Sequence, residues 1–500
     1  MFDRLSFSHH SARLENLGPR VETRRAGWSG RKISEVDLTL RRGVESGPLR
    51  YSPRGVSSVQ GLELPVTRSF CFLKMKKNFL IFIALACGLT ASLPAQLEQP
   101  EPEAFFFREG DRAMILGDSI TEQKMYSTLV ESFVLSRFPG WEISFRNTGW
   151  SGDTMGLRTR NGVEAGFDRD IKPLQPTAVT IDFGMNDARA GEGGYEPYLA
   201  NAATLVEKFA AIGTRVALIT SSPEERYLDG QPAGSVYNLL LRKYSDGLEA
   251  FAKKKGLVFV DQLAPMIEVI EKGREAGVLS KEEGGFRMIP DGVHPQWAGH
   301  LVMATAILKG LNAPGLVSSV AIDAKSGETK AVKAKVSDLK TGEIISFTRL
   351  DDAMPWPVPA EAVLPAPIPG FTPFEDLSRY LLKVTSLPSG NYRVSVDGKD
   401  FGSYTQEQLA EGVNLTQAAL TGLPEVKDLL VAIMAKNQLF FARWRTVQLF
   451  AFPDWVAAEA MEPARQAKLK DLDAQIVAAE VSVNELRKPK PHQWTVQLVP

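Results

Sequence analysis

The sequence predicts an α/β protein: a three-layer α/β/α domain with a parallel five-stranded sheet, followed by a small β-domain with a helical insertion. Three observations support this prediction. Between about residues 100 and 315, short apolar segments alternate with longer helical ones. After Pro314 apolar residues recur with a period of two, and residues 406–487 return to helical spacing. Short apolar strands separated by helices are typical of parallel sheets covered on both faces.

The first domain is expected over residues 100–315, and its apolar segments predict its strands and helices. The expected strands are Arg112–Leu116, Trp141–Arg146, Ala178–Phe183, Arg215–Thr220 and Leu257–Val260. The expected helices are Lys124–Phe138, Pro197–Ala211, Val236–Lys255 and Gln296–Leu311. Right-handed crossovers place these helices on both faces, and such sheets carry their sites at the carboxyl ends of the strands.

The region after residue 315 has a different pattern. Residues 316–353 are the β-rich start of an accessory domain, and residues 354–373, with seven prolines, are expected to form a stiff, extended connector. Residues 374–500 are expected to hold β-strands plus the helical insertion. Within it, Leu469, Leu472 and Ile476 begin a 3,4-spaced apolar series that indicates a helix packed along a partner helix. Trp494, Val496 and Leu498 alternate again, which predicts a last strand that returns to the β-domain.

The scarce residues point to a leader segment. Both cysteines and two of the five histidines precede residue 96. Met75 opens a segment with two lysines, an apolar run too short to span a bilayer, and Leu93-Pro94-Ala95 before Gln96. This is the layout of a secretory signal peptide, so we expect residues 75–95 to be removed and the protein to be secreted or periplasmic. Lipoprotein anchoring through Cys87 is an alternative, although the residues before Cys87 match that signal poorly. Residues 1–74 then form a probable mis-called upstream extension, expected to be disordered.

Composition excludes several classes of function. The net charge of −1 gives no basis for a nucleic-acid partner. Two cysteines exclude a disulfide scaffold and a cysteine-rich metal site. Nucleotide-loop and His-Glu-x-x-His motifs are absent, so we expect no cofactor and no metal. A metal-dependent hydrolase that uses Asp118 and Asp291 stays as an alternative. No stable membrane span is expected once the leader is cleaved.

Gly117-Asp118-Ser119-Ile120-Thr121 follows the first strand and leads into the first helix. A serine at this corner lies at the carboxyl edge of the sheet and near the positive end of a helix. Its hydroxyl can act as a nucleophile, and its amide can donate to a developing oxyanion. The structural alternative is a tight turn with a serine at the helix cap.

Asp291-Gly292-Val293-His294-Pro295 precedes the last helix of the domain. A nucleophilic serine needs a base, and the base needs a group that orients it; Asp291 and His294 can supply both from one loop. His300 lies within the following helix and is expected to be structural, and His492 lies in a Lys/Pro-rich tail.

Two further segments offer hydrogen-bond donors. Gly152 follows the second strand and permits close approach of its backbone amide to a ligand. Asn186, in Gly184-Met185-Asn186-Asp187, follows the third strand and can present its side-chain amide. Each segment alone could equally be an ordinary turn.

Taken together, the four segments resemble the four blocks of the GDSL/SGNH hydrolase family of serine esterases and acylhydrolases. The resemblance is to the secreted bacterial type of this family. Residues 117–121, Gly152, residues 184–187 and residues 291–294 match these blocks in order, with Ile120 departing from the fourth letter of the family name. The resemblance implies a flavodoxin-like sheet, a catalytic set of Ser119, Asp291 and His294, and an oxyanion hole made by Ser119, Gly152 and Asn186.

The implied function is serine-dependent ester hydrolysis through an acyl-enzyme, with a small-molecule or polysaccharide ester as substrate. Short-acyl or O-acetylated carbohydrate esters are favoured, because Trp150, Tyr195 and Tyr227 could face the site and stack on sugar rings. Two alternatives remain at this point: a catalytically inactive carbohydrate-binding or cell-surface protein on the same scaffold, and an acyltransferase.

Overall fold

The computed structural model describes residues 104–226, 234–282 and 285–499, which belong to one compact unit, Ala95–Pro500. The expected extension 1–74, the expected leader 75–95 and Tyr227 lie outside the described residues. Among the helices that are described, none has the length and apolar character needed to cross a membrane.

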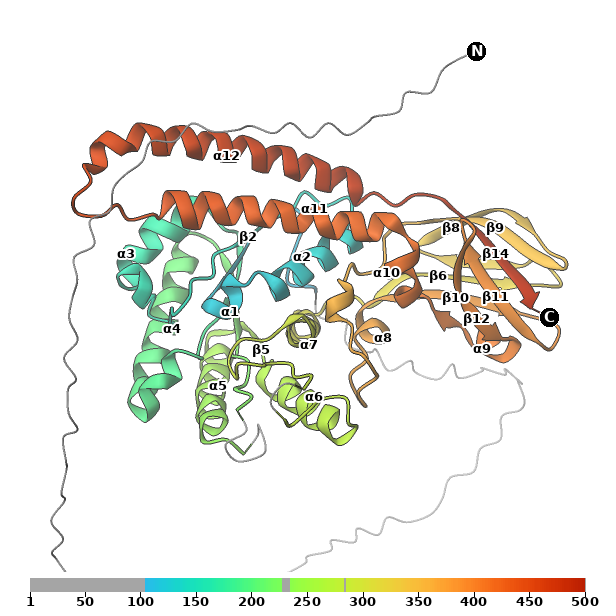
Figure 1. The fold of residues 1–500 in the computed structure, drawn as a ribbon, viewed down its shortest axis with the longest axis horizontal. Coiled ribbons are helices and arrows are strands. Elements are labelled where there is room, and N and C mark those ends of the chain that lie inside the picture. The colour runs from blue at the N-terminus through green and yellow to red at the C-terminus, as the bar shows by residue number, and fades with distance from the viewer. Residues whose placement is uncertain (1–103, 227–233, 283–284, 500) are drawn as a thin grey trace, which may run out of the picture. The chain divides into compact units, whose positions relative to one another are not determined.

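The first domain is built on a five-stranded parallel sheet (Figure 1). Its strands in spatial order are β2 (Ser144–Asn147), β1 (Arg112–Gly117), β3 (Ala178–Asp182), β4 (Arg215–Ile219) and β5 (Val258–Val260). Leu116, Ile181 and Leu218 on the three central strands are fully buried, as a sheet covered on both faces requires. The predicted fold class is confirmed.

Helices cover both faces of this sheet. On one face α2 (Met125–Arg137) packs against α7 (Trp297–Gly310), and on the other α4 (Tyr195–Ala211) packs against α5 (Val236–Lys255). α6 (Leu263–Glu275) follows β5 and contacts α7. The predicted strand at Trp141 begins only at Ser144, because Trp141 stacks on Phe138 at 3.8 Å between ring centroids in the preceding loop.

The β-domain consists of two sheets that share one apolar core. One sheet has the order β13-β10-β6-β7 and the other β12-β11-β14-β9-β8. The strands are β6 (Leu316–Asp323), β7 (Thr329–Val332), β8 (Ala334–Lys340), β9 (Ile344–Asp351), β10 (Arg379–Thr385), β11 (Asn391–Val396), β12 (Lys399–Thr405), β13 (Val413–Asn414) and β14 (His492–Val499). The last strand, β14, returns to lie between β11 and β9, and its Trp494 is fully buried.

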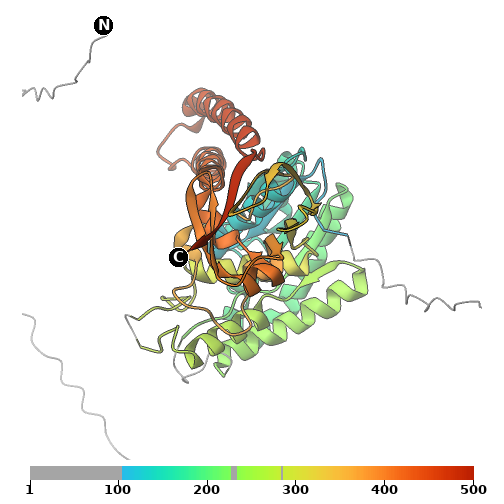
Figure 2. The same cartoon turned by 90° about the vertical axis from the view of Figure 1, so that its right-hand side faces the viewer.

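The insertion before β14 is a helical hairpin that we define as residues 424–486. It comprises α11 (Pro424–Phe441), a π-helical segment (Ala442–Gln448) and α12 (Ala458–Leu486); shorter helices α9 (Gln406–Glu411) and α10 (Thr416–Gly422) precede it. Figure 1 shows α11 and α12 as an antiparallel pair, and Figure 2 shows the pair almost end-on. α11 packs on α2 and on the edge strand β2. The hairpin therefore covers an edge of the sheet that would otherwise expose unpaired backbone groups.

The proline-rich segment 354–373 lies against the α/β/α domain. Trp356 is fully buried in the core of that domain, and its indole nitrogen donates to the carbonyl of Leu129 in α2 at 2.9 Å. Ser132 of α2 donates to the carbonyl of Pro357 at 2.9 Å. The segment thus attaches the β-domain to the first domain and is more than a spacer.

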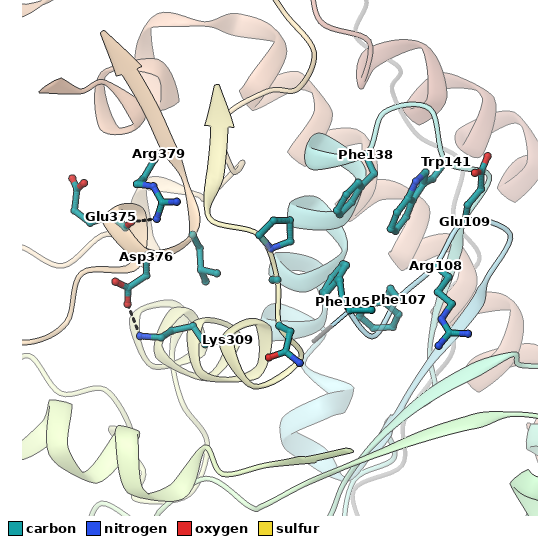
Figure 3. A pocket seen from close by; sticks show the side chains of 15 residues that line it. Phe105, Phe107, Arg108, Glu109, Phe138, Trp141, Lys309, Glu375, Asp376 and Arg379 are labelled. Atoms are coloured by element: carbon teal, nitrogen blue, oxygen red, sulfur yellow. Dashed lines mark hydrogen bonds and ion pairs between the residues drawn. The ribbon is translucent and has the colours of Figure 1, made fainter. Parts of the chain in front are cut away.

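A cavity of about 1240 Å³ opens between the residues that precede the first strand, the end of α7 and residues 375–379 (Figure 3). Phe105, Phe138 and Trp141 line one side of it, and Lys309 and Arg379 lie on the other. These residues flank the amino end of β1 and the carboxyl end of α7. The cavity is therefore at the opposite end of the sheet from Ser119, which follows the carboxyl end of β1.

Candidate active site

Ser119 is placed by the sharp turn from β1 into the four-residue helix α1 (Ser119–Glu122). Asp118 caps this helix, accepting the amide hydrogen of Ile120 at 2.9 Å. Gly117 is required at the turn, because a Cβ there would lie 2.1 Å from the Thr121 hydroxyl oxygen and 2.7 Å from the Asp182 carbonyl. Since α1 begins at Ser119, the amide of Ser119 has no partner within the helix and can donate to a ligand.

His294 reaches Ser119 from the loop before α7. Its Nε2 lies 2.9 Å from the Ser119 Oγ, and its Nδ1 lies 2.7 Å from Oδ2 of Asp291. The other oxygen of Asp291 accepts the backbone amides of His294 and Val293, at 2.7 and 2.9 Å. The three side chains thus form a continuous hydrogen-bonded chain, although Ser119 and His294 are 175 residues apart in sequence.

The Asp291 carboxyl is suited to remain ionised. Burial acts against its charged form, but the backbone amides of His294 and Val293 and the His294 ring outweigh it and hold the pKa of Asp291 below its ordinary value. A permanent negative charge on one side of the imidazole favours a proton on Nδ1 and leaves Nε2 free to accept one.

Gly152 lies in the loop that follows β2. Its φ of +77° falls in the left-handed region, which favours glycine. Its carbonyl accepts from Nε of Arg158 at 2.7 Å, while its amide donates to nothing within residues 104–226, 234–282 and 285–499. The loop is packed tightly against α1, because a Cβ on Gly149 would lie 2.2 Å from the Glu122 nitrogen.

Asn186 lies after β3 with its side-chain amide turned toward the same corner. Nδ2 donates to the carbonyl of Asp153 at 2.9 Å and approaches Oδ2 of Asp118 at 3.4 Å. The first bond orients the carboxamide. The second is long and weak, so a ligand oxygen could replace it.

Two carboxyl groups behind the site are shifted toward neutrality. Burial raises the pKa of Asp118 to about 7, against the hydrogen bond from Ile120. Burial likewise raises the pKa of Asp187 to about 7, although Asp187 accepts the amide of Met155. A proton on Asp118 weakens it as an acceptor, which leaves the second N–H of Asn186 available to a ligand.

The remaining candidates have structural surroundings. His300 is fully buried, accepts the Tyr126 amide at 3.3 Å and pairs with Gln123 at 2.9 Å. Burial lowers the pKa of His300 to about 3, so the ring stays neutral. Tyr195 packs on Tyr244, with ring centroids 5.6 Å apart. His492 was expected in a Lys/Pro-rich tail, but it lies in β14 between two carboxylates.

Trp150 contacts the helical hairpin instead of presenting a free face for a sugar. The Arg445 guanidinium lies 4.0 Å over its ring, and Trp444 meets it edge-on at 6.0 Å between centroids. Sequence reasoning did not include Arg445, Glu122 or the fully buried Asp153–Arg160 ion pair at 2.7 Å. Nothing in the spacing of these residues marks them, because their partners come from distant segments.

The possible metal ligands Asp118 and Asp291 have different roles in the fold. Asp118 caps α1, and Asp291 is held by its own loop and by His294. Within the described part of the chain, no three His, Cys, Asp or Glu side chains gather in a way that could hold a metal ion.

The fold and the motifs at the carboxyl edge of its sheet match those of the SGNH hydrolase fold. Residues 115–302, which form most of this domain, match the GDSL-like Lipase/Acylhydrolase family. The resemblance predicted from the four motifs is confirmed. No curated protein matches the sequence.

One solved structure extends the likeness beyond this domain. A gut microbial diltiazem-metabolizing enzyme aligns with 23% identity and a TM-score of 0.64, over 79% of this chain and 98% of its own. That share exceeds the α/β/α domain, so the two proteins also have the later part of the fold in common. An acetylxylan esterase from Geobacillus stearothermophilus (23% identity, TM-score 0.33) covers 41% of this chain and 96% of its own. An alpha/beta hydrolase from the metagenome of Lake Arreo, Spain (22%, 0.34), covers 42% and 98%.

Proposed function

We propose that the protein is a serine-dependent ester hydrolase that acts through an acyl-enzyme on short-acyl or O-acetylated carbohydrate esters. The observation that carries the proposal is the hydrogen-bonded chain from Asp291 through His294 to Ser119, with contacts of 2.7 and 2.9 Å. These are the distances at which a base can take a proton from a nucleophile while a carboxylate orients it.

In the first half of the reaction, His294 Nε2 takes the hydroxyl proton as Ser119 Oγ forms a bond to the ester carbonyl carbon. The Asp291 carboxylate stabilises the imidazolium that results. The tetrahedral intermediate collapses as its bond to the alcohol oxygen breaks, and His294 returns the proton to that oxygen. The alcohol leaves, and the acyl group stays on Ser119.

In the second half, His294 takes a proton from a water molecule as its oxygen attacks the acyl carbon. This intermediate collapses as the bond between the acyl carbon and Ser119 Oγ breaks, and His294 returns the proton to Oγ, which restores the hydroxyl and releases the acid. The amides of Ser119 and Gly152 and the Asn186 carboxamide are assigned to the oxyanion in both halves. Each such donor contributes about 3–4 kcal/mol of transition-state stabilisation.

The substrate class follows from the openness of the site. The side chains of His294 and Asp291 are 36% and 57% exposed, so the reacting groups lie near the surface. An open site accommodates a small acyl group carried on a bulky alcohol such as a sugar chain. A long acyl chain would instead need an apolar channel to leave water.

Ser119→Ala tests the mechanism. We expect the variant to lose turnover of p-nitrophenyl acetate while keeping its melting temperature, and Ser337→Ala, at an exposed serine of β8, to retain full activity. Undiminished hydrolysis by Ser119→Ala would refute the assignment. With wild type, rates should fall from acetate to octanoate esters, and acetylated sugars should be deacetylated.

Labelling with a serine-directed fluorophosphonate distinguishes the proposed esterase from a non-catalytic carbohydrate-binding protein on the same scaffold. Covalent labelling of Ser119, located by mass spectrometry, supports the enzyme; a chain that stays unlabelled and inactive supports the binding protein.

Export is also part of the proposal, because the segment from Met75 to Gln96 has the layout of a leader. N-terminal sequencing of the natural protein should find Gln96 or a neighbouring residue first, and an intact segment 1–74 would contradict this.

A further inference from the structure

The helical hairpin reaches the loop that carries Gly152. Trp444, in its π-helical segment, is fully buried, and its indole nitrogen donates to the carbonyl of Asp170 at 3.3 Å. The neighbouring residue, Arg445, lies with its guanidinium over the ring of Trp150. A segment almost 300 residues further along the chain is thus fixed two residues from a proposed oxyanion donor. π-Helical turns within α-helices are frequently found at functional sites.

Glu122 links this segment to the nucleophile. Its Oε1 lies 3.2 Å from Nε of Arg445, and its Oε2 accepts the backbone amide of Ser151 at 3.0 Å and the Ser151 hydroxyl. Glu122 is the last residue of α1, which begins at Ser119. One carboxylate therefore joins the helix that bears the nucleophile to the residue next to Gly152.

Arg445 is the group that fixes this carboxylate. The side chains of Arg445 and Glu122 are 29% and 17% exposed, so the ion pair is partly shielded from water. Without Arg445, the Glu122 carboxylate would be a partly shielded charge without its cation. Turning toward solvent would then lower its free energy, and it would release Ser151. The cation over Trp150 would be lost as well, which removes a second contact with the same loop.

We infer that Arg445, carried by the helical hairpin, is a positioning residue that holds the Gly152 amide where an oxyanion forms. The inference rests on the proposed esterase function and adds to it. Binding of an ester in its ground state needs this amide little, whereas the tetrahedral intermediate needs it fully. Loss of Arg445 should accordingly lower kcat and leave KM nearly unchanged.

The docking of the hairpin does not depend on Arg445. Lys436 of α11 forms an almost fully buried ion pair with Glu131 of α2, and Asn437 donates to the same carboxylate at 2.9 Å. These contacts remain when Arg445 is replaced, so the hairpin stays in place and the effect on the loop can be measured separately from folding.

Arg443 supplies a matched control. It lies in the same π-helical segment, but its Nε pairs with Asp473 of α12 at 2.6 Å, within the hairpin itself. Arg443→Ala removes the same charge and a similar contact without touching the Gly152 loop. We expect Arg445→Ala to lower kcat for p-nitrophenyl acetate by about 10- to 100-fold, and Arg443→Ala to change it less than twofold.

Two further measurements separate positioning from general damage. Arg445→Lys keeps a cation near Glu122 and should recover part of the lost kcat. Hydrogen exchange of the peptide that contains residues 149–153 should become faster in Arg445→Ala and stay unchanged in Arg443→Ala. The rate of fluorophosphonate labelling should fall in parallel with kcat, because the phosphonyl oxygen occupies the same position as the oxyanion.

The inference is overturned if Arg445→Ala keeps kcat within twofold of wild type, if KM rises at constant kcat, or if the control variant is equally impaired. Failure of the proposed function looks different: Ser119→Ala would then retain activity. If Ser119→Ala is inactive and Arg445→Ala is fully active, the proposed esterase function stands and only the positioning role of Arg445 is lost.

Discussion

The chain contains two histidine–aspartate pairs with almost the same geometry and different third partners. In the α/β/α domain, Nδ1 of His294 lies 2.7 Å from Asp291, and in the β-domain Nδ1 of His492 lies 2.7 Å from Asp397. In both pairs the other aspartate oxygen accepts a nearby backbone amide, from His294 at 2.7 Å and from Gln493 at 2.8 Å.

The second ring nitrogen makes the difference. Nε2 of His294 faces the Ser119 hydroxyl, whereas Nε2 of His492 lies 2.6 Å from the carboxylate of Glu425. Burial opposes a charge on His492, but Glu425 and Asp397 outweigh it and raise the pKa of His492. A histidine between two carboxylates keeps its proton and acts as a structural cation. A histidine between a carboxylate and a hydroxyl can accept one, so the third partner decides which pair serves as a base.

The largest expected effect comes from making the same substitution in both pairs. His294→Gln keeps a donor toward Asp291 but removes the base, and kcat/KM for p-nitrophenyl acetate should fall by at least about 10⁴-fold. His492→Gln should leave kcat/KM within a factor of about two, because the ring contacts neither Ser119 nor its donors. Equal losses in the two variants would show that the comparison is wrong.

The sequence predicted the site in the α/β/α domain, because its residues lie in short local motifs. Ser119, Gly152, Asn186 and the pair Asp291/His294 each follow a strand or precede a helix within a short motif, and the carboxyl edge of a parallel sheet brings such motifs together. The helices and strands that were expected in this domain have bounds within about three residues of the prediction, since apolar periodicity is a local property, whereas α6 was not predicted.

The partners of His492 could not be predicted in this way. Asp397 and Glu425 approach from β11–β12 and from α11, and their meeting depends on how the two sheets and the helical hairpin pack. The same holds for Arg445 and Glu122, which are more than 300 residues apart in sequence. The buried pair Lys436–Glu131 is likewise invisible in a helical pattern, where both residues look like solvent-facing charges.

The order of the two variants in stability should be the reverse of the order expected for their activity. His492 and Glu425 are almost fully buried, so His492→Gln leaves a shielded carboxylate with a weaker partner. The free energy of unfolding at pH 6 should fall by about 1–3 kcal/mol. The His294 pair is far more exposed, and His294→Gln should change it by less than about 1 kcal/mol. Urea denaturation followed by tryptophan fluorescence measures both; a larger loss for His294→Gln would contradict the structural role of His492.

The smallest expected effect is the pH dependence of that stability difference. The raised pKa of His492 means that the folded state binds its proton more tightly than the unfolded chain does. This contribution is fully present below the ordinary histidine value and is lost as pH rises through the folded pKa. Glu425 and Asp397 have lowered pKa values, so their contribution is lost instead as pH falls below their ordinary range.

The difference in unfolding free energy between wild type and His492→Gln should therefore be largest between about pH 5 and 6.5. It should become smaller on either side of this window, by roughly 1 kcal/mol at high pH. The buried carboxyls of Asp118 and Asp187 also lower stability as pH rises through about 7, but both are present in the two proteins, so the subtraction removes their effect. If the difference in unfolding free energy between wild type and His492→Gln does not depend on pH, the second carboxylate does not hold the proton on His492. The contact of His294 with Ser119 would then be the only feature that distinguishes the catalytic histidine from the structural one.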